Sequence, residues 1–102
     1  GLSQHQDALG SYQQAIEAYD EALARAPDYI NALNNKGLAL QSLGDLQRGL
    51  SQHQDALASW QAALTEFEHS LELAPGDEYI RRRRDQLQES LDGLEYDSES
   101  SP

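Results

Sequence analysis

Residues 1–9 read GLSQHQDAL, and residues 49–57 read the same nine letters. The second copy begins 48 positions after the first. Self-similarity at a fixed spacing indicates a repeat architecture, so both copies are expected to share one local structure. Later residues recur at the same spacing: Ser11, Gln13, Ala15, Leu23, Ala26 and Pro27 return as Ser59, Gln61, Ala63, Leu71, Ala74 and Pro75.

The shared structure is predicted to be helical. In each copy apolar residues recur at alternating steps of three and four, which places them along one helical face. In the second copy this face holds Leu46, Leu50, His53, Leu57, Trp60, Leu64, Phe67, Leu71 and Ala74. His5 and His53 lie on this face in the first and second copy, so we expect both histidines to be partly buried and to pack against another helix. A metal site is not expected, because Asp7 and Asp55 lie two residues on and face away.

Four helices are predicted, over residues 2–26, 29–43, 45–74 and 78–94. Pro27 and Pro75 stop the first and third helices, because proline cannot continue the hydrogen-bond ladder. Gly44 is expected to end the second helix. Gly49 would then lie inside a long third helix, where glycine costs about 1 kcal/mol relative to alanine. The alternative is that the helix breaks at Gly49 and the repeated segment folds back. Residues 1–94 are expected to form a single domain, and the acidic residues 95–102 a disordered tail.

Composition excludes several functions. The chain has 18 acidic and 7 basic residues and a net charge of −11, which disfavours nucleic acids and anionic membranes as partners. It has no cysteine, no apolar run of about 20 residues and no signal-peptide pattern, which favours the cytoplasm. No phosphate loop or nucleophile motif occurs, so we expect neither an enzyme nor a cofactor.

Two proline-terminated segments carry a family pattern. A small residue is followed by an aromatic residue four positions on and by proline eight further, in Ala15, Tyr19 and Pro27 and in Ala63, Phe67 and Pro75. The short helix between them contributes Leu33, Gly37 and Leu40, and Gly37 is expected to be a point of close helix contact. Over residues 10–80 the chain therefore resembles the tetratricopeptide repeat family.

The resemblance implies an all-α fold of antiparallel helical hairpins. The family repeat spans about 34 residues. The longer period of this chain adds two heptads, which are expected to elongate the second helix of the hairpin while keeping its apolar face in register. The last helix is then a C-terminal solvating helix.

The resemblance also implies a protein-interaction adaptor that binds a peptide, with acidic character, in a groove. Some members clamp a peptide carboxylate, and Asn35 and Arg83 match two positions of that clamp, whereas its lysines are absent and Lys36 faces elsewhere. Arg83 belongs to the run Arg81 to Arg84, which holds four of the seven basic residues. The predicted groove residues are Asn31, Asn34, Asn35, Leu38, Gln41, Tyr79, Arg82 and Arg83.

A self-assembly element is the alternative function. An overlong helix needs cover for its apolar side, which another copy could supply as a homodimer or by domain swapping. The residues predicted to mediate this self-association are Leu46, Leu50, Leu57 and Trp60.

Overall fold

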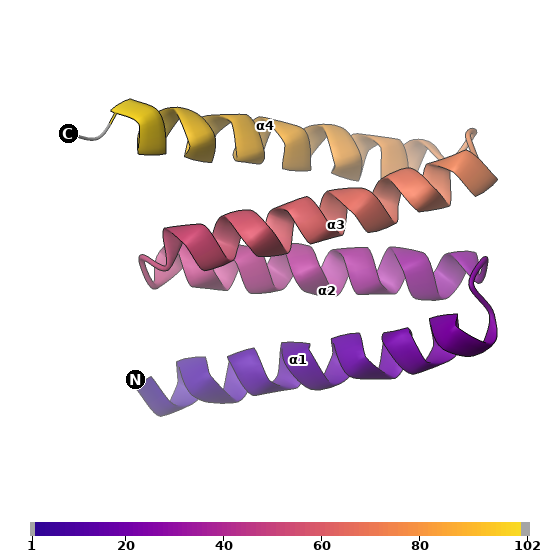
Figure 1. Cartoon of the computed structure of the whole chain (residues 1–102), viewed down its shortest axis with the longest axis horizontal. Helices are drawn as coiled ribbons and strands as arrows, with labels where there is room; N and C mark the ends of the chain where they lie inside the picture. Colours follow the sequence, from indigo (N-terminus) through magenta and orange to yellow (C-terminus); the bar gives the residue numbers. More distant parts are fainter. Residues whose placement is uncertain (1, 101–102) are drawn as a thin grey trace.

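A computed structural model describes the backbone of residues 2–100 and the side chains of residues 4–94. This part of the chain consists of α1 (Leu2–Arg25), α2 (Ile30–Gly49), α3 (His53–Leu73) and α4 (Glu78–Ser100), and it contains no strand. Consecutive helices run antiparallel, and short turns connect them (Figure 1). The all-α fold of antiparallel hairpins is confirmed.

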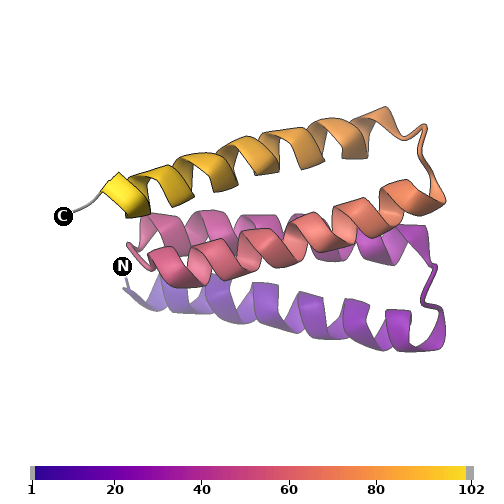
Figure 2. The same cartoon turned by 45° about the horizontal axis from the view of Figure 1, so that its top comes forward.

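The helices form two layers. Helix α3 packs on both α2 and α4, whereas α1 packs chiefly on α2. In the turned view α3 lies in front of α2, and α1 and α4 flank this central pair (Figure 2). Helices α2 and α4 therefore share one side of the molecule, and α3 forms its other side.

The turn between α2 and α3 lies at residues 50–52, so the predicted boundaries at Gly44 and Asp45 are wrong. Ser51 has φ 62°, and the N–H groups of Ser51 and Gln52 donate to the carbonyls of Arg48 (3.0 Å) and Gln47 (2.8 Å). These bonds form a Schellman motif, which satisfies the last carbonyls of α2. Gly44 does not end a helix, since no described glycine has a positive φ.

The two additional heptads are consequently shared between the two helices of the hairpin. Helices α2 and α3 are almost equal in length, at 20 and 21 residues. The expected elongation of the second helix alone is therefore wrong. Lengthening both helices keeps the two apolar faces opposite each other along their whole length.

Two glycines of α2 receive the large aromatic side chains of α3. The ring of Phe67 rests on Gly37, where a β-carbon would lie 2.6 Å from its Cε1 atom, and the indole of Trp60 rests on Gly44. Phe67 and Trp60 are 0% and 2% exposed. The prediction of close contact at Gly37 is confirmed. These aromatic residues belong to a core cluster with Leu40, Ala56, Ala63, Ile80, Leu87, Leu91 and Leu94.

Helix α4 begins with a side-chain cap and extends beyond its predicted end. The backbone N–H of Ile80 donates to the Asp77 carboxylate at 3.1 Å. The helix continues to Ser100, beyond the predicted end at Leu94, and the disorder of the acidic tail stays a prediction. No proline interrupts the chain between Pro75 and Pro102, so the backbone ladder has no covalent reason to stop at Leu94. Residues 101–102 of the predicted tail lie outside the described residues.

Candidate peptide-binding face

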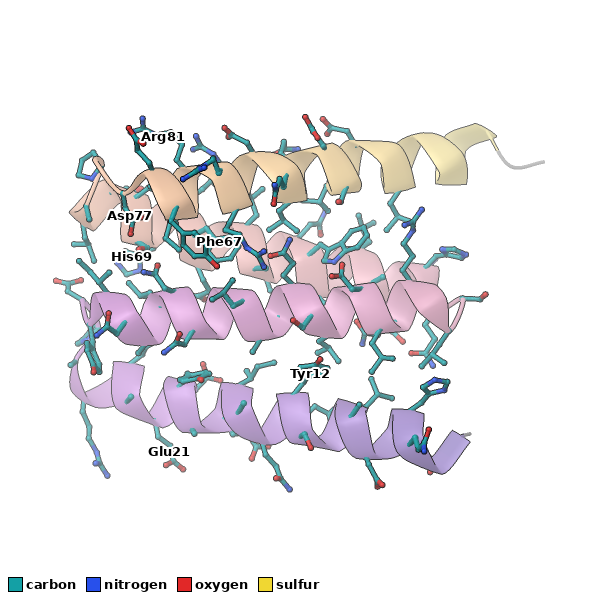
Figure 3. The ribbon with its side chains drawn as sticks, turned by 180° about the vertical axis from the view of Figure 1, so that it is seen from behind. Tyr12, Glu21, Phe67, His69, Asp77 and Arg81 are labelled. Carbon is teal, nitrogen blue, oxygen red and sulfur yellow. The ribbon has the colours of Figure 1, made fainter. Side chains whose placement is uncertain are left out.

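Helices α2 and α4 together form the face on which the sequence placed a groove. Seen from behind, they run side by side in front of α3, and Phe67 lies between them (Figure 3). Four of the predicted groove residues are exposed: Asn31, Asn35, Tyr79 and Arg82. The other four are half-buried: Asn34, Leu38, Gln41 and Arg83. Leu38 also packs against the core cluster.

Gln41 and Arg83 join the two helices directly. The Nη2 atom of Arg83 donates to Oε1 of Gln41 at 2.7 Å, which links residues 42 positions apart. This hydrogen bond fixes the guanidinium between α2 and α4. Among the predicted groove residues, two buried polar atoms have no hydrogen-bond partner in the described part of the chain, Nε of Arg83 and Oδ1 of Asn34. Of the eight predicted groove residues, Gln41 and Arg83 are the pair that the structure brings into hydrogen-bond contact.

The four consecutive arginines differ in what they bind. Arg81 donates to the backbone carbonyl of Pro75. Arg84 forms an ion pair with Asp85 at 2.9 Å. Arg82 makes a long 3.5 Å contact with the carbonyl of Glu78. Neither Arg82 nor Arg83 forms an ion pair with a carboxylate among the side chains of residues 4–94.

Lys36 faces away from this surface, as predicted. Its Nζ atom lies 2.7 Å from Asp20 on α1 and 3.2 Å from Glu66 on α3. Burial lowers the pKa of Lys36, but the hydrogen bonds and charges of these two carboxylates outweigh burial and raise it overall. Lys36 is therefore a structural link across three helices.

Asp45 and Gln47, which the sequence did not single out, anchor α3 to α2. The indole N–H of Trp60 donates to Asp45 at 3.1 Å, and Ser59 donates to Gln47 at 2.6 Å. Burial of Asp45 raises its pKa, and the bond from Trp60 and the charges of Arg83 and Arg48 oppose that rise. The recurrence of a serine–aromatic pair at the same repeat position was the available sequence signal.

The predicted self-association residues have different surroundings. Trp60 is buried inside its own chain, so the expectation that a second chain covers it is corrected. The predicted helix over residues 45–74 is divided by the turn at residues 50–52, and Trp60 packs against α2 across that turn. Leu46, Leu50 and Leu57 are half-buried, and their part in self-association stays a prediction.

The histidines are not on the buried side. His5 and His53 are both exposed, which corrects the expectation of partly buried packing. His53 is the first residue of α3, directly after the turn at residues 50–52. In the part of the chain that the structure describes, no three histidine or carboxylate side chains converge as metal ligands. No helix among these residues combines the length and apolar character of a membrane span.

Comparison with known proteins gives one match. A family model described as a TPR repeat matches residues 8–44, which run from α1 through most of α2. No curated protein and no solved structure matches the chain significantly.

Proposed function

We propose that this chain, which carries a tetratricopeptide repeat, is a protein-interaction module that holds an extended acidic peptide on the α2–α4 face. Repeats of this family generally mediate contacts between proteins rather than catalysis. Stacked helical repeats offer extended surfaces for such partners. The family match supports a role in protein–protein interaction, and the side chains of the α2–α4 face support binding of an acidic peptide.

The observation that carries the proposal is the state of Arg82 and Arg83. Neither guanidinium group lies within ion-pair distance of a carboxylate among the described side chains, in a chain whose net charge is −11, although the charge of Arg83 also acts on Asp45. Gln41 orients Arg83 across the face. A guanidinium group binds a carboxylate through two parallel hydrogen bonds, so an acidic side chain or chain end is the complementary ligand.

The neighbouring groups suit an extended peptide. Asn31 and Asn35 are exposed on α2, and their amides can donate to and accept from a peptide backbone. Tyr79 is 55% exposed at the start of α4 and offers an aromatic surface. This arrangement supports binding along the helices, with the acidic groups near the arginines.

Fluorescence anisotropy with a labelled peptide of alternating glutamate and threonine tests the proposal. Arg83→Gln should weaken binding about tenfold or more, because a hydrogen bond between charged groups contributes about 1.5–3 kcal/mol. Arg84→Gln is the matched control, since Arg84 is already paired with Asp85, and it should change the dissociation constant by less than about twofold. Equal affinity for a glutamine–threonine peptide, or wild-type binding by Arg83→Gln, contradicts the proposal.

A further inference from the structure

Two stripes of side chains run side by side along α4, and they differ in charge. Residues three and four positions apart share one side of a helix. Arg83 reaches Gln41 on α2, so its stripe is the one next to α2, which we call the inner stripe: Tyr79, Arg83, Gln86 and Ser90. The adjacent stripe, which we call the outer stripe, holds Glu78, Arg82, Asp85, Glu89 and Asp92.

The inner stripe carries a single charge, that of Arg83. Tyr79, Gln86 and Ser90 are neutral and exposed, whereas Arg83 is half-buried. The exposed residues of α2 that belong to the same face, Asn31 and Asn35, add no charge. An acidic ligand group therefore has one point of attraction on this stripe.

The outer stripe has an excess of negative charge. All five of its residues are exposed, and four of them are carboxylates. Arg84 pairs with Asp85 at 2.9 Å. Glu78 and Glu89, in contrast, form no ion pair with any side chain of residues 4–94. These two carboxylates are consequently available to a positively charged ligand group.

Asp45 places a further negative charge beside Arg83 from the α2 side. Asp45 is exposed on α2. Burial raises its pKa and the charge of Arg83 lowers it, so the two groups lie within electrostatic reach of each other. A ligand carboxylate on Arg83 is thus surrounded by carboxylates of the chain, which repel a second acidic group next to it.

The spacing of these charges matches that of an extended peptide. Glu78 and Glu89 lie five and six residues from Arg83, which corresponds to about 8 and 9 Å along the helix axis. Three residues of an extended peptide span about 10 Å. A ligand side chain three positions before or after its acidic residue is therefore level with one of these carboxylates, at about one Debye length from Arg83.

We propose that the α2–α4 face selects peptides in which one acidic residue is flanked by a basic residue three positions to each side. The acidic residue binds Arg83, and the basic residues face Glu78 and Glu89. This inference rests on the proposed function and narrows its ligand from an acidic peptide in general to one with an isolated acidic group. A continuous acidic tract is the poorer ligand.

Three short peptides that differ at two positions test this selectivity. Each is blocked at both ends, so that its termini carry no charge, and has one central glutamate in a threonine background. The residues three positions to each side are both lysine, both glutamine or both glutamate. In fluorescence anisotropy the full chain should bind the lysine-flanked peptide about threefold or more tighter than the glutamine-flanked one, and the glutamate-flanked peptide about threefold or more weaker, because two exposed charge contacts change together.

Chain variants separate the outer stripe from the net charge of the chain. Glu78→Gln combined with Glu89→Gln should reduce the ratio of the affinities for the lysine-flanked and glutamate-flanked peptides about threefold or more. Glu17→Gln combined with Glu21→Gln is the matched control, because it removes the same charge from exposed positions of α1. Figure 3 shows Glu21 on the side of α1 that is turned away from α2. The control should change the ratio by less than about twofold.

Three outcomes would overturn the proposal. Equal affinities for the three peptides, all weakened by Arg83→Gln, would refute the selectivity and leave the proposed function standing. Absence of binding by all three peptides would refute both. An equal fall of the affinity ratio in the two double variants would assign the selectivity to the net charge of the chain rather than to Glu78 and Glu89.

Discussion

Phe67 rests on the backbone of Gly37, so that a β-carbon at position 37 would lie 2.6 Å from the ring. The ring cannot move away easily, because Phe67 is 0% exposed and belongs to the core cluster. The contact fixes how closely α2 and α3 approach each other.

Gly37→Ala should therefore lower the free energy of unfolding by about 1–2 kcal/mol, because the overpacking cost exceeds the gain in helix propensity. Urea denaturation followed by circular dichroism measures the change. Gly10→Ala is the matched control. Apart from the chain neighbours and the helix's own backbone, no described atom lies within 4 Å of a β-carbon there, so the change should raise stability by about 0.5–1 kcal/mol. An increase in stability of Gly37→Ala would contradict the prediction, because it would mean that the Phe67 ring can shift without cost.

Lys36→Met should lower stability by about 1–3 kcal/mol at neutral pH, because it leaves Asp20 and Glu66 without their shared cation. The pKa of Lys36 is raised above 10.5 in the folded chain, so the contribution is complete below pH 10.5. It is lost as pH rises through the folded pKa. The difference between wild type and variant, measured from urea midpoints, should thus be constant near neutrality and shrink in strong alkali. A difference independent of pH there would assign the effect to packing alone.

Asp45→Asn should leave stability at neutral pH unchanged or raise it by at most about 0.5 kcal/mol, since the carboxyl is partly solvent-exposed and screened. Burial raises the Asp45 pKa above 3.8, so the ionised form disfavours the fold, and wild type gains stability as pH falls through the folded pKa. Asparagine keeps the acceptor for Trp60 without that charge. A loss above about 1 kcal/mol at neutral pH would mean that attraction to Arg83 and Arg48 outweighs burial.

Ser51→Gly should raise stability by about 0.5–1 kcal/mol, because Ser51 has φ 62° and a β-carbon is strained in that region. Thermal unfolding measures it. Gln52→Gly, where φ is −91°, is the control and should lower stability through chain entropy. Equal effects at both positions would contradict the turn geometry.

The helical face and the proline stops were predictable, because periodicity and Pro27 and Pro75 are local signals. The turn at residues 50–52 was predicted only as the alternative break at Gly49 and not as the main boundary. The nine letters GLSQHQDAL lie within α1 from Leu2 onward, but in the second copy Leu50, Ser51 and Gln52 form the turn. Identical residues thus adopt different backbones, and tertiary packing decides which. The predicted helix end at Gly44 was wrong because a glycine that makes room for an aromatic ring cannot be told from a glycine that ends a helix by sequence alone. In the structure the indole of Trp60 packs on Gly44.

For the candidate site, the resemblance placed Gln41 and Arg83 on the same face, and the structure joins them by a hydrogen bond. Their exact pairing depends on how far α4 lies from α2, which no local pattern encodes. The predicted exposure of Trp60 was wrong because it depended on the turn position. With the turn at residues 50–52, α3 packs along α2 and buries Trp60.

The even division of the extra heptads between α2 and α3 gives this hairpin a definite height. Helices of 20 and 21 residues rise about 30 Å, and each heptad adds about 10 Å. A neighbouring hairpin of ordinary height would leave two turns of apolar helix bare, so hairpins of this kind stack best on others equally tall. We therefore expect repeat length to restrict which hairpins can stack on one another.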